Sequence, residues 1–273
     1  MILFYILFLW EIHMHMKIGI VGSQGHVGSA MRELFPNAIC YDIGLGSKEE
    51  INRCDTVFVC VPTPAREDGS CNTDIVESVI GWINVPLIIL RSTVYVGFTD
   101  LMCEKYHKEI VFQPEYYGET ADHPFRDLRT RRWLTFGGSE KGIHLAIKTY
   151  QTVYNSGVSI YHGDAKSIEM AKYLENCFFA TKVVFCNEMK QIADALGANY
   201  DIAREAWLAD PRIGSSHTFV YDDNRGYGGS CLPKDMASIV YQANSSNTDA
   251  TLLKSVIKKN GILKETYRQD PVL

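Results

Sequence analysis

This 273-residue sequence lacks several patterns that would assign it to a common functional class. The formal net charge is −5 and no stripe of lysine and arginine stands out, so no nucleic acid is expected as a partner. The eight cysteines form no CxxC pair and no zinc spacing, and the eight histidines have no partner at metal-ligand spacing, so we expect no metal site. Several cysteines lie instead in apolar strand or helix patterns, as the reduced core cysteines of a cytoplasmic protein do.

A long hydrophobic run is also missing. The apolar stretch Met1 to Trp10 is too short to cross a bilayer, and it has neither a basic region before it nor a small-residue cleavage site after it. A second start, Met16-Lys17, directly precedes the first predicted strand. We therefore expect residues 1–15 to be an extension upstream of the true start codon, outside the fold; a membrane tether is the alternative.

A glycine-rich turn follows the first apolar strand, Lys17 to Val21. It reads GSQGHVG, one residue longer than the dinucleotide pattern GxGxxG. Glycines allow a tight turn and a close approach to pyrophosphate, and the helix that follows directs its N-terminus at the phosphates. A second strand, Ala38 to Tyr41, ends in Asp42, whose carboxylate accepts hydrogen bonds from ribose hydroxyls and repels a 2′-phosphate. The pattern predicts binding of NAD in preference to NADP.

Strand and helix patterns alternate beyond Asp42. Apolar strands are expected at 56–61, 87–90, 108–112 and 133–136, the last closing this half of the chain, and a helix is expected at 74–82. Alternation of this kind predicts an α/β fold with a Rossmann-type, doubly wound parallel sheet, in which ligands gather at the C-terminal ends of the strands. We assign residues 16–162 to an NAD-binding domain.

The pattern becomes all-helical from Asp164. This residue can cap a helix that runs to about Leu196, with Gly197 as its stop, and further helices are expected from residues 201, 233 and 249. We assign residues 163–273 to a helical central domain. Apolar residues surround much of the long helix, more than one small helical region covers, so the sequence predicts a homodimer formed through this helix.

Three polar residues, Glu169, Lys172 and Asn176, lie on one face of the long helix. A solvated polar face is the simple alternative. Because apolar residues such as Phe179 and Val183 make much of the helix covered, a lysine and an asparagine one turn apart indicate a polar pocket.

The segment GGSCLPKD runs from Gly228 to Asp235. If a helix begins at Pro233, Cys231 lies at its N-terminus, where the macrodipole and the unbonded amide groups favour a thiolate. Asp235 returns to the same side one turn later. A half-buried cysteine before an ordinary helix is the alternative; the dinucleotide turn upstream favours a nucleophile.

Together these segments resemble the UDP-glucose/GDP-mannose dehydrogenase family over most of residues 16–260. The segments that carry the resemblance are Pro62-Thr63-Pro64 with Asp68-Gly69, Ser92-Thr93-Val94, Pro114-Glu115 with Glu119, Lys172 to Glu188, Arg212-Ile213-Gly214, and Gly226 to Cys231 with Lys234-Asp235. The family oxidises the C6 alcohol of a nucleotide sugar to a carboxylate with two NAD. The resemblance implies a cytoplasmic, dimeric oxidoreductase of polysaccharide biosynthesis, with UDP-glucose as the substrate and UDP-glucuronate as the product.

The resemblance also implies residue roles. Cys231 attacks the aldehyde to give a thiohemiacetal and then a thioester. Lys172 and Asn176 stabilise the oxyanion, and water and protons are handled by Asp235, Thr93 and Glu119. The implied cofactor-binding residues are Gly22, Gln24, Gly25, His26, Val27, Gly28, Asp42, Val61, Pro62, Thr63, Ser92, Thr93, Glu119 and Lys234. The implied substrate-binding residues are Glu115, Tyr116, Glu119, Lys172, Asn176, Arg212, Tyr227 and Gly228.

The sequence departs from the family pattern in ways that bear on nucleotide-sugar affinity. We expect it to lack the family's third, C-terminal UDP-binding domain, and the stretch between Asp42 and Cys54 is short. The substituted positions are Arg91 for lysine, Tyr95 for proline, Gln113 for asparagine, and Tyr116-Tyr117-Gly118 for FLR. Two other functions stay open: a non-catalytic NAD-binding remnant or partner subunit, and a β-hydroxyacid dehydrogenase-like oxidoreductase, which would not need Cys231.

Overall fold

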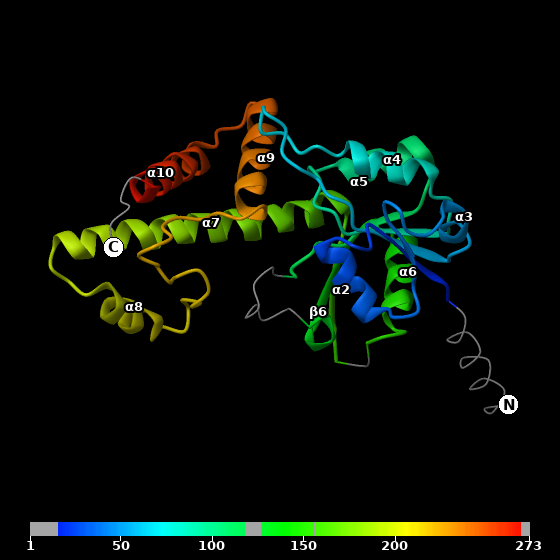
Figure 1. The fold of residues 1–273 in the computed structure, drawn as a ribbon, viewed down its shortest axis with the longest axis horizontal. Helices are drawn as coiled ribbons and strands as arrows, with labels where there is room; N and C mark the ends of the chain where they lie inside the picture. The colour runs from blue at the N-terminus through cyan, green and yellow to red at the C-terminus, as the bar shows by residue number, and fades with distance from the viewer. Residues whose placement is uncertain (1–15, 118–126, 155–156, 269–273) are drawn as a thin grey trace. The chain divides into compact units, whose positions relative to one another are not determined.

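The computed structural model describes residues 16–117, 127–154 and 157–268. The chain divides into two compact units (Figure 1). The first contains the chain up to Pro64 together with Asn72–Lys172, and the second contains Ala65–Cys71 together with the chain from Tyr173 onward. Helix α7 (Ala165–Ala195) begins in the first unit and continues in the second.

The first unit is built on a seven-stranded sheet with the strand order β2-β1-β3-β4-β5-β6-β7. The strands are β1 (Ile18–Val21), β2 (Ile39–Tyr41), β3 (Thr56–Val59), β4 (Leu87–Leu90), β5 (Ile110–Phe112), β6 (Trp133–Gly137) and β7 (Ser159–Gly163). Every neighbouring pair is parallel except β5 and β6, which are antiparallel. The predicted α/β, Rossmann-type fold is confirmed.

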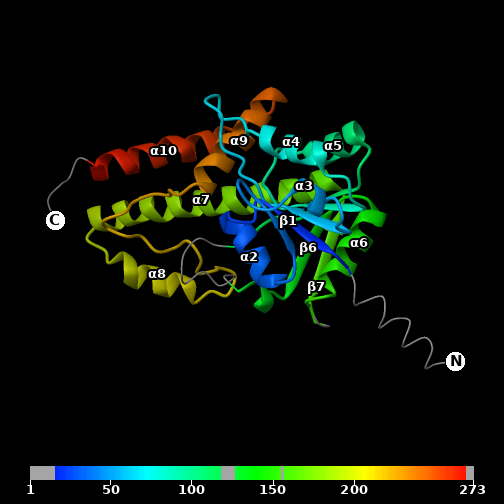
Figure 2. The ribbon, with the colours of Figure 1, turned by 45° about the vertical axis from the view of Figure 1, so that its right-hand side comes forward.

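Helices cover both faces of this sheet (Figure 2). One face packs against α2 (His26–Leu34), α6 (Glu140–Tyr150) and the 3₁₀ turn η1 (Leu128–Thr130), and the other against α3 (Lys48–Ile51), α4 (Asp74–Trp82) and α5 (Phe98–Tyr106). The central strands β1, β3, β4 and β5 are therefore buried on both faces, which explains why they read as unbroken apolar runs.

The prediction that the strand at 133–136 closes this half of the chain is wrong. Strand β7 follows it and pairs in parallel with β6 along its whole length, Trp133 opposite Ser159 and Gly137 opposite Gly163. As the edge strand of the sheet, β7 has mostly exposed side chains. Its sequence SIYHG therefore lacks the run of buried apolar residues from which a strand is predicted.

The predicted start and stop of the long helix are confirmed. The Asp164 carboxylate accepts hydrogen bonds from the backbone N–H of Ser167 at 2.9 Å and from its hydroxyl at 2.7 Å, as a capping residue does. Beyond the last helical residue, Gly197 has a φ of +71°, a left-handed conformation that glycine adopts without strain.

The second unit is helical, with a small core of its own. After α7 come α8 (Tyr200–Leu208), α9 (Cys231–Ser245) and α10 (Thr251–Arg268). Its core contains Cys177, Ala180, Val184, Tyr227, Met236 and Val256. The turn at Gly69, with a φ of +87°, packs against α9: a Cβ added there would lie 3.5 Å from that of Ala237.

Helix α9 begins two residues before the predicted start at Pro233, at Cys231 itself. Proline lacks a backbone N–H, but the amides of a first helical turn have no intrahelical acceptor, so Pro233 is tolerated there. The cysteine is consequently the first helical residue instead of a residue that precedes the helix.

Candidate active site

The glycine turn after β1 is shaped by close backbone packing. Gly22 has a φ of +80°, and a Cβ there would lie 2.7 Å from the carbonyl oxygen of Cys60. A Cβ on Gly28 would lie 2.0 Å from the carbonyl oxygen of Gly22. Both positions therefore require glycine for the fold itself. Gly25 is exposed, and its Cβ would meet nothing nearer than 3.4 Å, so the absence of a side chain there leaves the surface open.

The start of α2 fits a pyrophosphate group. Gly25 is its N-cap residue and offers no side chain to the amides of the first turn, which have no intrahelical acceptors. The hydroxyl of Ser23, inside the turn, is fully buried and has no hydrogen-bond partner among the described residues. The N-terminus of a helix directs backbone N–H groups and the positive end of the helix dipole at an anion, so these residues fit the phosphates of a dinucleotide.

Asp42 lies beside this turn, at the end of β2. Its carboxylate accepts hydrogen bonds from the backbone N–H of Gln24 at 2.7 Å and of Ile43 at 2.8 Å. The half-buried carboxylate is thus held next to the turn, where a ribose that follows the pyrophosphate would lie.

The ends of β3 and β4 are joined by hydroxyl groups. The Thr63 hydroxyl donates to the carbonyl oxygen of Thr93 at 2.7 Å, and the Ser92 hydroxyl donates to that of Val61 at 2.6 Å. Two predicted groups of cofactor-binding residues, 61–63 and 92–93, therefore meet at the C-terminal edge of the sheet. Ligands of open α/β sheets bind at this edge.

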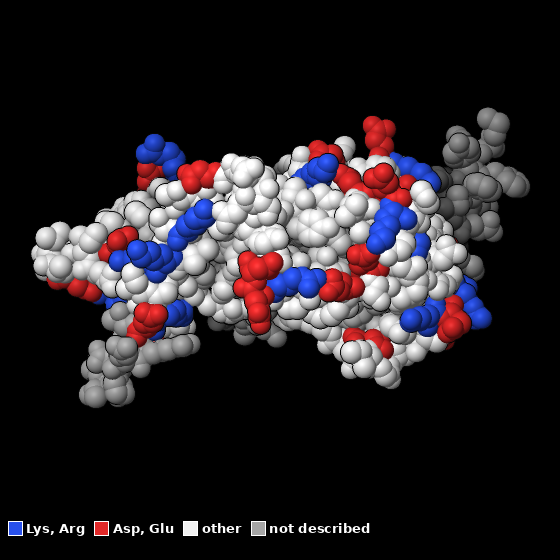
Figure 3. All heavy atoms as spheres, turned by 90° about the horizontal axis from the view of Figure 1, so that it is seen from above, with Lys and Arg blue, Asp and Glu red and all other residues white. Residues whose placement is uncertain are grey.

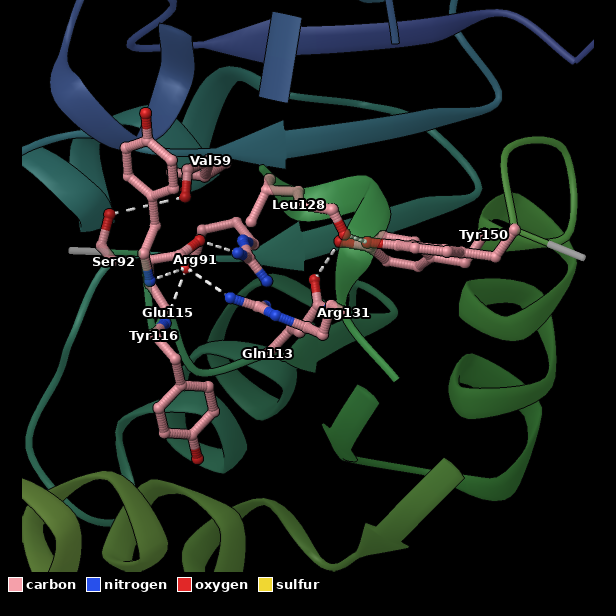
Figure 4. A network of polar contacts seen from close by, with 11 residues as sticks. Val59, Arg91, Ser92, Gln113, Glu115, Tyr116, Leu128, Arg131 and Tyr150 are labelled. Carbon is pink, nitrogen blue, oxygen red and sulfur yellow. Dashed lines mark hydrogen bonds and ion pairs between the residues drawn. The ribbon is translucent and has the colours of Figure 1, made fainter. Parts of the chain in front are cut away.

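A buried charge cluster that the sequence did not predict lies at the same edge (Figure 4). Glu115 forms ion pairs with Arg91 and with Arg131, whose Nη2 lies 3.2 Å from Oε1. The three side chains are 1–8% exposed, and burial lowers the pKa of Arg91. Glu115 was predicted to bind substrate; its carboxylate is directed at these two guanidinium groups, and the predicted role stays a prediction.

Further hydrogen bonds hold the surroundings of this cluster (Figure 4). The Tyr150 hydroxyl donates to the side-chain oxygen of Gln113, and the Tyr154 hydroxyl donates to the carbonyl oxygen of Leu128. Burial raises the pKa of Tyr150 to about 12, so this phenol stays a neutral donor at physiological pH. The first bond ties the end of α6 to the residue after β5, and the second ties turn η1 to the residues that follow α6.

In the first unit, the ammonium group of Lys172 lies over an aromatic ring. Its Nζ is 4.9 Å from the ring centroid of Tyr116. Glu169, one turn earlier on α7, accepts hydrogen bonds from the backbone N–H of Gly97 at 2.5 Å and from the N–H and hydroxyl of Thr99 at 2.9 and 2.6 Å. Glu169 thus anchors α7 to the start of α5, which accounts for part of the predicted polar face.

In the second unit, Asn176 and Asp235 are in direct contact. The Asn176 Nδ2 donates to Asp235 Oδ2 at 2.5 Å, and the Lys234 ammonium group lies 2.6 Å from Oδ1. Asp235 is 1% exposed, so this carboxylate is buried with one cationic and one neutral donor. Three predicted site residues, 59 positions apart at most, are therefore brought together.

Cys231 is the one exposed cysteine of the eight, all of which lie within the described ranges. It is the first residue of α9, where the helix dipole and the amides of the first turn favour negative charge. By contrast, burial raises the pKa of the Cys60 and Cys177 thiols to about 12 and of Cys54 to about 11. Cys231 is accessible and lies at a helix N-terminus, two features that reactive cysteines share.

The remaining predicted substrate residues are spread along the second unit. Arg212 is exposed and pairs with Asp210, while the Lys182 ammonium group donates to the nearby carbonyl oxygen of Gly214. The Tyr227 side chain lies in the core, where burial raises its pKa to about 12. Its backbone N–H donates to the Asn260 side chain at 2.8 Å and its carbonyl oxygen accepts from it at 3.1 Å, so its predicted contact with substrate stays a prediction.

Glu119 lies outside the described residues, so its predicted roles stay predictions.

Within the described ranges, no group of three or more His, Cys, Asp and Glu side chains could hold a metal ion. None of the helices in the part of the chain that the structure describes is long and apolar enough to cross a membrane. On the face in Figure 3, acidic and basic side chains are interspersed without a broad patch of either sign.

Two models of one protein family match adjoining parts of the chain. Residues 40–155 match the NAD-binding domain of the UDP-glucose/GDP-mannose dehydrogenase family, and residues 166–261 match the central domain of the same family. The chain is 32% identical over 218 residues to the UDP-glucose 6-dehydrogenase YwqF of Bacillus subtilis, covering 76% of this chain and 49% of that protein. It is 29% identical over 232 residues to the GDP-mannose 6-dehydrogenase of Pseudomonas syringae, covering 78% and 52%.

The fold also matches solved structures. A UDP-glucose dehydrogenase from the archaeon Pyrobaculum islandicum superimposes with a TM-score of 0.78 at 22% identity, over 91% of this chain and 68% of that one. The chain spans about half the length of the curated relatives it matches.

Proposed function

Because the chain belongs to the UDP-glucose/GDP-mannose dehydrogenase family, we propose that it is a nucleotide-sugar dehydrogenase that oxidises UDP-glucose to UDP-glucuronate. Its cofactor is NAD, which fits the open glycine turn and the uncapped start of α2. The observation that carries the proposal is the exposed Cys231 at the N-terminus of α9, in the same unit as the buried Asn176–Asp235–Lys234 cluster. A β-hydroxyacid dehydrogenase has no need of such a cysteine.

Cys231 is the proposed covalent nucleophile. NAD, when bound, would supply the hydride acceptor, one molecule for each of the two oxidations. The Cys231 thiolate adds to the carbon of the aldehyde that the first oxidation leaves, forming a C–S bond and a thiohemiacetal. The second oxidation leaves a thioester on Cys231; water adds to its carbonyl carbon, the C–S bond breaks, and the carboxylate departs while the thiol is restored. Thiolates are strong nucleophiles and thioesters are readily hydrolysed, so cysteine suits both steps.

Two residues one turn apart on α7 are proposed to stabilise the negative charge that develops on the substrate oxygen. The Lys172 ammonium group and the Asn176 amide are the proposed stabilisers, because fixed donors aimed at a developing oxyanion lower the barrier most. Asp235, with Thr93 and Glu119, is proposed to accept and return protons and to orient the hydrolytic water. Arg212 and the backbone of Gly228 are proposed to hold the sugar nucleotide.

The preference for NAD over NADP is the first test. Since like charges in contact cost several kcal/mol, the Asp42 carboxylate should weaken NADP binding about 100-fold relative to NAD. The Asp42→Asn variant keeps an acceptor for the N–H of Gln24 and should narrow the ratio to within about tenfold. Calorimetry measures both affinities, with Glu49→Gln, which removes an exposed charge from α3, as the control. Tighter binding of NADP than of NAD by the parent protein would contradict the assignment.

The second test concerns assembly, which we propose to be a homodimer through α7. Six large apolar residues of α7 are 41–79% exposed and recur at intervals of three, four and seven residues, so they form a stripe along one side of the helix. These residues are Leu174, Phe178, Phe185, Met189, Ile192 and Leu196. A stripe of this length on an otherwise mixed surface marks a protein interface.

Light scattering at micromolar concentration should give the mass of a dimer for the parent. The double variant Phe178→Glu/Phe185→Glu should give a monomer, because it buries two charges in the contact. Gln191→Glu, which places a charge away from the stripe, is the matched control and should stay dimeric. A monomeric parent would exclude this interface.

The cytoplasm is the proposed location, because buried cysteines such as Cys54 and Cys60 are reduced thiols.

A further inference from the structure

One aromatic ring in the first unit connects the buried charge cluster to a proposed catalytic residue. The face of Tyr116 carries the Lys172 ammonium group, whose Nζ lies 4.9 Å from the ring centroid. The ring also packs edge-to-face against Trp133, at 4.7 Å between centroids. The guanidinium carbon of Arg131 lies 5.9 Å from the Tyr116 centroid and 5.6 Å from that of Trp133. The Tyr116 ring is therefore held by its neighbours where the Lys172 ammonium group lies over it.

The backbone of Tyr116 is held as firmly as its ring. Glu115 Oε1 accepts hydrogen bonds from the backbone N–H of Tyr116 at 2.6 Å and of Tyr117 at 2.5 Å. The same carboxylate is held by Arg91 and Arg131, and Figure 4 shows both guanidinium groups turned toward it. Because these groups are nearly fully buried, water does not compete for the contacts.

A second contact ties the same segment to the nucleotide turn. The ring of Tyr117 lies against that of His26, the first residue of α2, with 4.5 Å between centroids. The backbone at residues 115–117 is thus fixed from the charge cluster on one side and from the glycine turn on the other. A segment held from two sides in this way positions an aromatic ring more firmly than an unsupported loop does.

We propose that Tyr116 is a positioning residue for Lys172, and that the cluster of Arg91, Glu115 and Arg131 fixes Tyr116 for this role. The long, flexible lysine side chain has several rotamers, and attraction between its ammonium group and the ring quadrupole selects the one over Tyr116. A stabiliser that is already in place when charge develops needs no reorganisation during the reaction. The proposal rests on the proposed function of Lys172 and adds to it the residue that orients it.

The central test replaces the aromatic ring with an aliphatic side chain. Tyr116→Leu should lower kcat by roughly five- to tenfold, the range of a partly desolvated cation–π contact between two half-buried side chains, with KM for the nucleotide sugar changed by less than about twofold. Tyr116→Phe keeps the π face and should retain the parent kcat within about twofold. Equal losses in both variants, or a loss confined to KM, would mean that Tyr116 acts on the substrate through its hydroxyl or its shape, and would overturn the proposal.

A second readout requires no turnover. The rate at which an amine-reactive acetylating reagent modifies Lys172 is measured by peptide mass spectrometry and divided by the rate for Lys166, an exposed lysine on the same helix. The Tyr116→Leu variant should raise this ratio severalfold because the ammonium group is no longer held, whereas Tyr116→Phe should leave it unchanged. An unchanged ratio in Tyr116→Leu would overturn the proposal whatever happens to kcat.

The two readouts separate this inference from the proposed function. If Lys172→Met keeps the parent rate of NADH formation, the catalytic role of Lys172 is wrong, while the labelling ratio still reports on the contact with Tyr116. If Lys172→Met is inactive and Tyr116→Leu has the parent kcat, the catalytic role stands and the positioning role is wrong.

The contribution of the cluster of Arg91, Glu115 and Arg131 is tested with a separate variant. Arg131→Lys keeps a positive charge near Glu115 but loses the planar group that lies over Tyr116 and Trp133. A smaller change of the same kind is expected, about threefold in kcat with an increased labelling ratio and an unchanged KM. If KM rises and the labelling ratio stays at the parent value, Arg131 acts on substrate binding and not through Tyr116.

Discussion

The Cys231→Ser variant is expected to carry out the first oxidation and to fail to release the carboxylate, with a loss of at least about 10³-fold in uronic acid formation. Serine is a poorer nucleophile than a cysteine thiolate at neutral pH, and an ester is hydrolysed far more slowly than a thioester. Because Cys231 is exposed, the free energy of unfolding should not change measurably.

Intact mass spectrometry of Cys231→Ser with NAD and UDP-glucose shows which step is blocked. A covalent adduct with the mass of the sugar nucleotide indicates an ester that cannot be hydrolysed, and the absence of an adduct together with arrested turnover indicates that the serine does not attack. Both results support a nucleophilic Cys231. Cys40→Ser, at a half-buried cysteine on β2, is the control and should keep the parent rate. Formation of the uronic acid by Cys231→Ser at the parent rate would contradict the thioester mechanism.

Removal of the Asp235 carboxylate should have the largest effect on stability. Asp235→Ala leaves the Lys234 ammonium group, which is 15% exposed, without its anionic partner and takes away the acceptor of the Asn176 amide. Breaking a buried ion pair by removal of one partner costs about 3 kcal/mol or more of the free energy of unfolding. Asp235→Asn keeps an acceptor oxygen and should cost about 1 to 2 kcal/mol. Both variants should lose activity, because Asp235 is proposed to move protons.

Urea unfolding followed by circular dichroism measures these losses. The control is Asp194→Ala, which breaks the more exposed Lys190–Asp194 pair on α7 of the same unit. Pairs of this surface kind contribute about 0.3 to 0.5 kcal/mol. An Asp235→Ala variant no less stable than Asp194→Ala would show that the buried cluster does not stabilise the second unit.

Elements with strong local signals were predicted closely from the sequence. Helix α4 has its predicted bounds, and α7 begins after Asp164 and ends before Gly197 as expected. The residues that give these signals are local: Asp74 is the first residue of α4, and Asp164 and Gly197 flank the two ends of α7. The exposed edge strand β7 was missed because it depends on pairing with β6, and its own residues show no buried face.

The candidate site was predicted in part. The glycine turn with Asp42, the meeting of Thr63 with Thr93, and the contact of Asn176 with Asp235 join residues that the motifs had already singled out. The Arg91–Glu115–Arg131 cluster was not foreseen. Its charges are 24 and 16 positions apart, and isolated arginines read as surface residues until the sheet brings them together.

The most direct test of the proposed function is NADH formation by the purified chain, followed by absorbance, against a panel of UDP- and GDP-sugars. We expect activity with UDP-glucose, a yield of two NADH for each nucleotide sugar consumed, and no release of uronic acid by the Cys231→Ser variant. If NAD binds and no sugar of the panel yields NADH, the chain is a non-catalytic NAD-binding protein and the proposed dehydrogenase activity is wrong.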